Sequence, residues 1–341
     1  MLWELGRASY VMRQDKGVPR LAVLVWVREI FGCSCMRKFA LSKKAVVGLG
    51  IVALLVSGGV LFCFVAGSVL VAPRPCLVTL PQLFTGTAVS FPSGSGATLH
   101  GNLLGGTSGK GVVILMHGVR GHRGSMAGHG EFLHRAGYSV LLFDFQAHGE
   151  SAGSKITSGY LESKDAAAAV DFVRDKLPGE KIAVIGSSLG GAATILADPP
   201  LQIDGAILEM VYPDIERAVK NRIAIVLGNW ARPLSCLLTW QLRPRLGVRA
   251  DWFQTCKKVQ RMNCPKLIVG GANDRHTTLA DTKELFVSAT DPKELWIVEN
   301  AAHQDLHLLA REEYETRILA FLDRHLNSAQ KDLSDQSVKS K

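Results

Sequence analysis

The chain has 341 residues, of which 47% are hydrophobic and 20% charged, and its formal net charge at pH 7 is +9. Residues 1–44 hold nine Lys and Arg against three acids, so the remaining 297 residues have a net charge of only +3. Because that remainder has no basic run longer than a pair and no zinc-finger or basic-helix pattern, the composition argues against a nucleic-acid partner. The seven cysteines show no CxxC pair or Cys/His spacing, so we expect no metal site.

A long uncharged segment runs from Ala45 to Ala72 and is rich in Val, Leu, Ile, Phe and Gly. About 20 apolar residues suffice for a helix to cross a bilayer, so residues 45–72 predict a single membrane span. Four basic residues lie within the eight positions before it, whereas only Arg74 lies between the span and Lys110. The positive-inside rule therefore predicts a cytoplasmic N-terminus and an extracytoplasmic (periplasmic or exoplasmic) remainder. A cleaved signal peptide is the alternative, disfavoured by the length of the apolar stretch.

The chain is expected to divide into five parts. They are a basic cytoplasmic segment (1–44), a transmembrane signal-anchor (45–72), a Pro-punctuated linker (73–86), a globular domain (87–326) and a disordered Ser/Lys/Asp-rich tail (327–341).

The first 35 residues show no clear hydrophobic period. Met36-Arg37-Lys38 would itself make a natural start to a signal-anchor, which makes Met36 a candidate start of the chain.

Strand-like and helix-like segments alternate in the globular part. Thr87–Phe91 and Thr98–Leu104 flank a Gly/Ser-rich turn and predict a hairpin. Continuous apolar runs predict further buried strands at Val112–Met116, Tyr138–Phe143, Ile182–Ile185, Ala206–Glu209, Lys266–Val269 and Leu295–Val298. Helical patterns follow at Gly128–Ala136, at Asp165–Lys176, after Ser188 and at Glu312–His325. The alternation indicates an α/β fold with a mostly parallel sheet and helices on both faces.

This alternation stops between Pro213 and Asn263. The stretch is helix-like and holds three of the six tryptophans, Trp230, Trp240 and Trp252. We expect residues 213–263 to form a helical cap inserted at the carboxyl edge of the sheet and to determine substrate specificity.

The motif Gly186-Ser187-Ser188-Leu189-Gly190-Gly191 lies between a buried strand and a small, helix-compatible run. A strand, a Gly-x-Ser-x-Gly turn and a helix are typical of a nucleophile elbow, in which glycines permit the sharp turn that exposes the serine. Only Ser188 fits the register, because Ser187 has no glycine two positions before it. Taken alone, the motif is equally compatible with a glycine-rich turn without chemistry.

A serine nucleophile needs an adjacent base that a third group orients. Asp274 follows one expected strand and His303 follows the next, both at carboxyl strand ends, where Ser188 is also expected. The chain order Ser, Asp, His matches this type of site. Either residue alone would more often be a turn or loop residue, but together they predict a Ser188–His303–Asp274 triad.

Other acids and histidines are weaker candidates for the same roles. Asp281 is expected within a helix, and Glu209 at a strand end is expected to form structural hydrogen bonds. His307 is expected inside a helix, and His276 lacks a strand end of its own.

An oxyanion hole requires preorganised backbone N–H donors. We expect one donor from Leu189, the residue after the nucleophile, and the other from Val119 in the loop that begins at His117-Gly118. The side chains of His117 and Arg120 are expected to serve loop packing and the surface.

With these pieces in place, the chain resembles an α/β-hydrolase-fold serine hydrolase over roughly residues 87–326. It is most similar to the small, N-terminally membrane-anchored abhydrolase proteins, often labelled serine-aminopeptidase-like. The pieces are His117-Gly118, the segment 143–151, Gly186–Gly191, Asp274 and His303. The family pattern Asp-x-Arg-Gly-x-Gly-x-Ser is altered, because Gln146-Ala147 replaces Arg-Gly. The change bears on subfamily and substrate rather than on the triad.

The resemblance implies Ser188 as nucleophile, His303 as general base and then acid, Asp274 as orienter, and no metal or organic cofactor. We expect a carboxylic-ester hydrolase that acts on a small acyl-ester or lipid-like substrate near the membrane. Thioester or amide cleavage would use the same acyl-enzyme step. A peptidase or acyltransferase on this triad, or a non-catalytic membrane-tethered scaffold, are the alternatives.

Overall fold

The computed structural model describes residues 42–81 and 86–326. The expectations for Met36, for most of the basic segment 1–44 and for the tail 327–341 lie outside the described residues. The described residues divide into two compact units between Val56 and Ser57, within helix α2.

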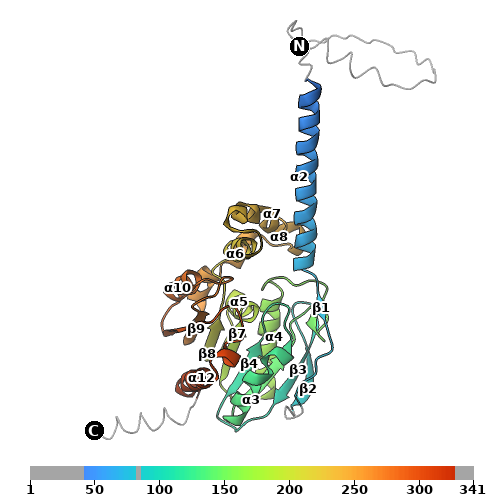
Figure 1. Ribbon diagram of the computed structural model, residues 1–341. Helices are drawn as coiled ribbons and strands as arrows, with labels where there is room; N and C mark the ends of the chain where they lie inside the picture. The colour runs from blue at the N-terminus through green and yellow to red at the C-terminus, as the bar shows by residue number, and fades with distance from the viewer. Residues whose placement is uncertain (1–41, 82–85, 327–341) are drawn as a thin grey trace, which may run out of the picture. The chain divides into compact units, whose positions relative to one another are not determined.

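Helix α2 (Lys43–Leu70) contains the apolar segment expected to span a membrane (Figure 1). Its most apolar 18-residue window has a mean hydropathy of 2.6, and none of that window is buried. At 1.5 Å per residue its 28 residues measure about 42 Å, more than the about 30 Å of a hydrocarbon core. The helix is therefore a candidate membrane span. It ends at Leu70, two residues before the predicted boundary, with Pro73 close behind.

Eight strands of the described chain form a mostly parallel sheet in the order β10-β9-β8-β7-β4-β5-β3-β2. Only β2–β3 and β3–β5 pair antiparallel, so the predicted hairpin and the predicted α/β class are both confirmed. The strands are β2 (Thr87–Pro92), β3 (Thr98–Leu104), β4 (Val112–Met116), β5 (Ser139–Phe143), β7 (Ile182–Ser187), β8 (Gly205–Glu209), β9 (Lys266–Gly271) and β10 (Lys293–Val298).

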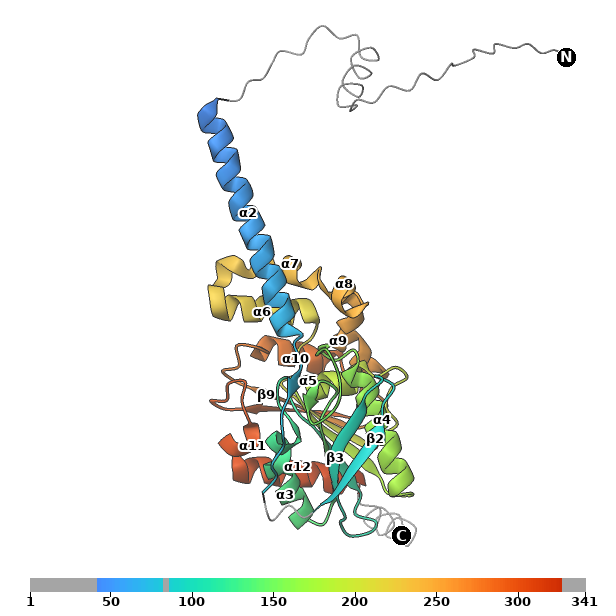
Figure 2. The same cartoon turned by 90° about the vertical axis from the view of Figure 1, so that its right-hand side faces the viewer.

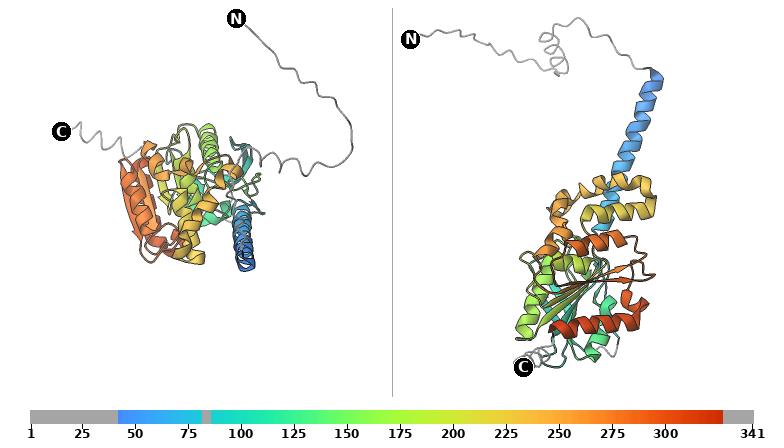
Figure 3. Two further views of the ribbon diagram at one scale, coloured as in Figure 1. Left: turned by 90° about the horizontal axis from the view of Figure 1, so that it is seen from above. Right: turned by 90° about the vertical axis from the view of Figure 1, so that its left-hand side faces the viewer.

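Helices cover both faces of the sheet, and alternate side chains of the central strands pack against one helix layer or the other. Val113 and Leu115 of β4 pack into the core shared with α3 (Ala127–Arg135) and α12 (Arg311–Leu326). Ile114 and Met116 face α4 (Glu162–Lys176) and α5 (Leu189–Leu196) instead. Helix α10 (Leu279–Ser288) joins this second face through Leu285. The two layers lie on opposite sides of the sheet (Figures 2 and 3), which explains why the strands read as continuous apolar runs.

Part of the predicted linker 73–86 is attached to the domain. Arg74–Pro75 (β1) pairs in parallel with His148–Gly149 (β6). The Arg74 N–H donates to Ala147 O at 2.7 Å, and the Cys76 N–H donates to Gly149 O at 2.8 Å. The prolines of residues 73–86 predict a linker. The strand β1 could not be predicted, because two residues are too few to show a hydrophobic period.

Between β8 and β9 the described chain forms only helical elements. They are α6 (Ile215–Leu227), η2 (Asn229–Leu234), α7 (Ser235–Thr239), α8 (Leu242–Leu246), η3 (Ala250–Phe253), α9 (Thr255–Lys258) and η4 (Val259–Arg261). This insertion contacts the last turns of α2 within the second unit: the Gln241 side chain donates to Cys63 O at 3.1 Å, and Arg245 donates to Phe64 O at 2.6 Å.

Candidate active site

Ser188 occupies the turn between β7 and α5, with φ 50° and ψ −100°. A non-glycine residue with positive φ is uncommon and stores strain, which neighbouring packing must sustain. The motif glycines permit this packing. A Cβ at Gly186 would lie 2.5 Å from Gly191 N, and one at Gly190 would lie 2.2 Å from Met116 O. Backbone therefore fills the space on both sides of the turn and holds the serine in its conformation.

The structure brings Asp274 and His303 to this serine. Asp274 follows β9 and His303 follows β10, so both side chains reach the edge where β7 ends. His303 Nδ1 lies 2.7 Å from Asp274 Oδ2, and His303 Nε2 lies 3.2 Å from Ser188 Oγ. The Nδ1–H can donate to the carboxylate while Nε2 accepts from the serine hydroxyl.

The Asp274 carboxylate is fixed by its own loop. Its Oδ1 accepts the backbone N–H groups of His276 at 2.7 Å and Thr277 at 2.9 Å. Its side chain is fully buried, whereas that of His303 retains 18% exposure. The acid is thus held rigidly and the imidazole is reachable from the cavity, an arrangement suited to orienting a base.

The backbone amides predicted as oxyanion donors flank Ser188. Leu189 is the first residue of α5, and the first N–H groups of a helix have no intrahelical acceptor. Val119 lies in the loop after β4 and lines one cavity together with Gly118, Ser188 and His303. The cavity volume is about 400 Å³, enough for a small acyl substrate.

Two buried histidines shape the Val119 loop. His117 Nε2 accepts the Phe145 N–H at 3.1 Å, so its Nδ1–H donates to Gly118 O at 2.8 Å. Burial lowers the pKa of His117 to about 3, which keeps this ring neutral. His148 Nε2 accepts the Arg120 N–H at 3.1 Å. These contacts on either side of Val119 orient the loop backbone, so His117 does more than the loop packing expected from sequence.

The segment around Gln146, where the family pattern is altered, contacts His148 and thereby supports the same loop. The Gln146 amide donates to the buried Glu162 carboxylate at 2.9 Å, which also accepts two bonds from Thr157 and one from Gly159. His148 Nδ1 lies 2.9 Å from Gln146 O. Glutamine at this position therefore satisfies a buried carboxylate through neutral donors.

The weaker candidates have structural contacts. Asp281 caps α10 and binds Arg217 at 2.9 Å. Glu209 accepts the Tyr314 hydroxyl, and burial raises the Glu209 pKa to about 7. His307 lies in α11 (Leu306–Leu309), as expected. Asp281 and His307 are thus engaged away from Ser188, whereas Glu209 lines the same cavity and its backbone carbonyl accepts the Ser188 N–H at 2.8 Å.

Arg222 of α6 and His276, one of the weaker candidates, also line the cavity with Ser188. The ring centroids of His276 and His303 are 5.0 Å apart. No local motif marks Arg222, because the insertion places it there through tertiary packing.

Among the described residues, no cysteine lines this cavity. The thiols of Cys236, Cys256 and Cys264 are free. Burial raises the pKa of Cys256 and of Cys264 to about 11, as expected for packed thiols.

The sheet order and the turn at Ser188 define the chain as an α/β-hydrolase-fold protein. A profile of the family described as "Serine aminopeptidase, S33" matches residues 107–236, which include Ser188 and end before Asp274. Among solved structures, the Pyrococcus furiosus esterase Pf2001 is similar at 23% identity with a TM-score of 0.62, over 75% of this chain and 98% of that one. The alpha/beta hydrolase GrgF from Penicillium sp. sh18 is 21% identical with a TM-score of 0.56, over 70% and 98% of the two chains.

Curated relatives give the same picture. The uncharacterized protein YqkD of Bacillus subtilis is 25% identical over 250 residues, which are 72% of this chain and 81% of YqkD. The lysophosphatidylserine lipase ABHD12 of Danio rerio is 25% identical over 193 residues, 54% of this chain but only 48% of that lipase. The resemblance to α/β hydrolases predicted from the motifs is confirmed.

Proposed function

We propose that the chain is a membrane-anchored serine hydrolase that cleaves a carboxylic ester, with Ser188 as nucleophile, His303 as general base and Asp274 as the carboxylate that orients it. One observation carries the proposal: the unbroken contact from Ser188 Oγ through the His303 ring to Asp274 Oδ2. A non-catalytic scaffold needs neither a strained serine nor a buried carboxylate hydrogen-bonded to a partly exposed imidazole.

The reaction follows from these contacts. Ser188 Oγ attacks the acyl carbonyl carbon as its proton moves to His303 Nε2, and the carbonyl oxygen becomes an oxyanion held by the Val119 and Leu189 N–H groups. The C–O bond to the leaving alcohol then breaks, and the alcohol takes the proton from His303. Water then attacks the acyl carbon as it gives a proton to His303. The bond from that carbon to Ser188 Oγ breaks, Ser188 takes the proton back from His303, and the acid is released.

Arg222 supports an ester substrate that also carries a negative charge. Its side chain lines the cavity, as do Glu209 and Asp305, and no carboxylate within residues 42–81 and 86–326 forms an ion pair with this guanidinium at 4.0 Å or less. An arginine is charged at all ordinary pH values and matches carboxylate or phosphate. Arg222→Gln is expected to raise KM for an anionic acyl ester more than for a neutral one, with Arg222→Lys between them. Equal KM changes for both esters would contradict this.

Membrane proximity is supported by the surface of the insertion. If the hydrocarbon core takes about 20 residues from Ala45, it ends near Phe64, whose carbonyl Arg245 contacts. Trp230 and Trp240, which are 77% and 76% exposed, would then lie at interface depth, where tryptophan is favoured. The proposed orientation places the domain outside the cytoplasm. A C-terminal reporter that is active only in the cytoplasm would contradict that orientation.

Fluorophosphonate labelling of the full chain tests the proposal. We expect an adduct on Ser188 in the wild type and in Ser187→Ala, the matched control, and none in Ser188→Ala. A folded wild type that forms no adduct would overturn the enzymatic function. A panel of p-nitrophenyl esters and aminoacyl anilides separates the classes, because anilide turnover far above ester turnover would favour a peptidase instead.

A further inference from the structure

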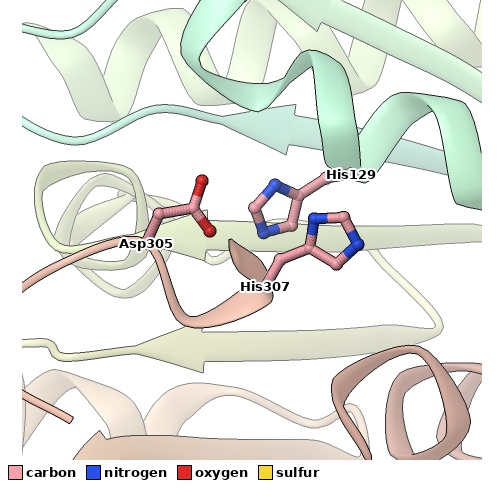
Figure 4. A group of neighbouring side chains, drawn as sticks. All are labelled: His129, Asp305 and His307. Atoms are coloured by element: carbon pink, nitrogen blue, oxygen red, sulfur yellow. The ribbon is translucent and has the colours of Figure 1, made fainter. Parts of the chain in front are cut away.

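A second cluster of chemically competent side chains lies beside the proposed active site. His129 comes from α3, Asp305 is the N-cap of α11, and His307 lies within α11. One ligand atom from each side chain can be chosen so that all three lie within 4.8 Å of one another. Figure 4 shows the Asp305 carboxylate and the His307 ring pointing toward the His129 ring. Two imidazoles and a carboxylate thus lie within reach of one ion.

The two histidines are buried yet incompletely bonded. Each is only 3% exposed. Both ring nitrogens of His129 and Nδ1 of His307 are buried and have no hydrogen-bond partner among the described residues. A buried nitrogen left unpaired costs about 1–3 kcal/mol, so three in one cluster call for a ligand.

Hydrogen bonds to neighbouring residues orient the His307 ring and the Asp305 carboxylate for metal binding. His307 Nε2 lies 3.0 Å from Glu315 Oε1, so an Nε2–H donated to this carboxylate leaves the Nδ1 lone pair directed at the cluster. Arg311 binds the same Glu315 oxygen at 3.1 Å and fixes the carboxylate. One oxygen of Asp305 caps Leu308 N–H at 3.1 Å, which leaves the other oxygen available.

We propose that His129, Asp305 and His307 bind a divalent transition-metal ion of the zinc type. Two imidazole nitrogens and one carboxylate oxygen suit zinc and its neighbours, whereas calcium and magnesium prefer oxygen ligands throughout. No local spacing in the sequence marks this site, because 176 positions separate His129 from Asp305.

The bound ion would join α3 to the loop that carries His303. Asp305 stands two residues after His303, and both line the cavity with His129. Metal binding therefore cross-links the segment holding the proposed base to the opposite wall of the cavity. This site does not depend on the proposed hydrolytic function, and the experiment below reads metal binding directly.

The test uses the full chain in detergent, stripped with a chelator and titrated with Co²⁺ by visible absorption and with Zn²⁺ in competition. We expect about one ion per chain in the wild type and in His134→Gln, which alters an exposed histidine on the same helix. His129→Gln and Asp305→Asn are expected to weaken binding at least about 100-fold, and Glu315→Gln about 10-fold. Asparagine can keep the N-cap of α11, so Asp305→Asn separates ligation from folding.

Thermal unfolding gives a second readout. Zn²⁺ is expected to raise the melting temperature of the wild type and of His134→Gln but not of His129→Gln, because the ion binds only the folded site. Equal Co²⁺ affinity in wild type and Asp305→Asn would overturn the proposal. So would a wild type that binds neither Co²⁺ nor Zn²⁺, and a more stable His129→Phe would then assign the His129 ring to aromatic packing.

Discussion

His303 Nε2 lies 3.2 Å from Ser188 Oγ, although 115 positions separate the two residues. The parallel pairing of β7, β8, β9 and β10 produces this proximity, because each residue follows a strand that ends at the same edge of the sheet. The geometry is therefore a property of the whole sheet, and substitutions that leave the sheet intact should separate catalysis from folding.

Asp274→Asn tests the orienting carboxylate. Asparagine can still accept the His276 and Thr277 N–H groups, but its amide cannot stabilise the His303 imidazolium or hold its Nδ1–H tautomer. We expect kcat for ester hydrolysis to fall about 10⁴-fold with an unchanged melting temperature. The exposed Glu299→Gln, in the loop after β10, is the control. A variant that keeps wild-type kcat would remove Asp274 from the mechanism.

His117→Phe tests the loop that presents Val119. The phenyl ring can fill the buried space but can neither accept the Phe145 N–H nor donate to Gly118 O. A displaced oxyanion donor is expected to lower kcat about 100-fold while KM changes little. Steady-state kinetics on one p-nitrophenyl ester measure this split, with His134→Gln as control. A rise in KM at constant kcat would assign His117 to substrate binding instead.

Gly190→Ala tests the steric basis of the elbow. Alanine normally stabilises a helix relative to glycine, but a Cβ here would lie 2.2 Å from Met116 O. We expect the clash to win and to lower the free energy of unfolding by about 1–3 kcal/mol, measured by urea denaturation. Gly105→Ala is the matched control, because a Cβ at Gly105 meets nothing within 4 Å. Equal stability of the two variants would refute the steric argument.

Asp165 makes stability depend on pH. Burial raises its pKa from 3.8 to about 6, so between these values the folded state holds more protons than the unfolded chain. Stability therefore falls as pH rises from about 4 to 6, by at most about 3 kcal/mol from this group. Relative to wild type, Asp165→Asn should gain stability between pH 4 and pH 7. Asp171→Asn, on the exposed side of the same helix, should show no such gain.

Trp230 and Trp240 report on membrane contact. In bilayers that contain brominated phospholipids, the fluorescence of a full chain carrying Trp3→Phe and Trp26→Phe should be quenched chiefly through these two exposed residues. The double variant Trp230→Phe/Trp240→Phe should lose most of the quenching, whereas Trp296→Phe, at a buried position, should not. Undiminished quenching in the double variant would place the insertion away from the bilayer.

Local patterns were sufficient to predict the sheet and the three residues of the proposed triad, Ser188, Asp274 and His303. Apolar runs such as Val112–Met116 are strands because both faces are covered, and Asp274 and His303 stand directly after such runs. Motifs of this kind need only short stretches of chain.

The missed features depend on long-range packing. The contacts of His148 with the Val119 loop and the convergence of His129 with His307 join segments that share no spacing or period. Arg222 reaches the cavity only because the insertion folds over it. A single sequence carries no local signal for such pairs.

The pairing of Arg74–Pro75 with His148–Gly149 has a mechanical consequence. The segment that follows α2 is bonded to the strand whose histidine accepts the Arg120 N–H, one residue from the expected oxyanion donor. Tension on α2 would therefore pull on the loop next to Ser188 before it reached the sheet. A shortened chain without α2 should accordingly begin at residue 73, not at residue 87, if the proposed ester hydrolysis is to proceed at the full rate.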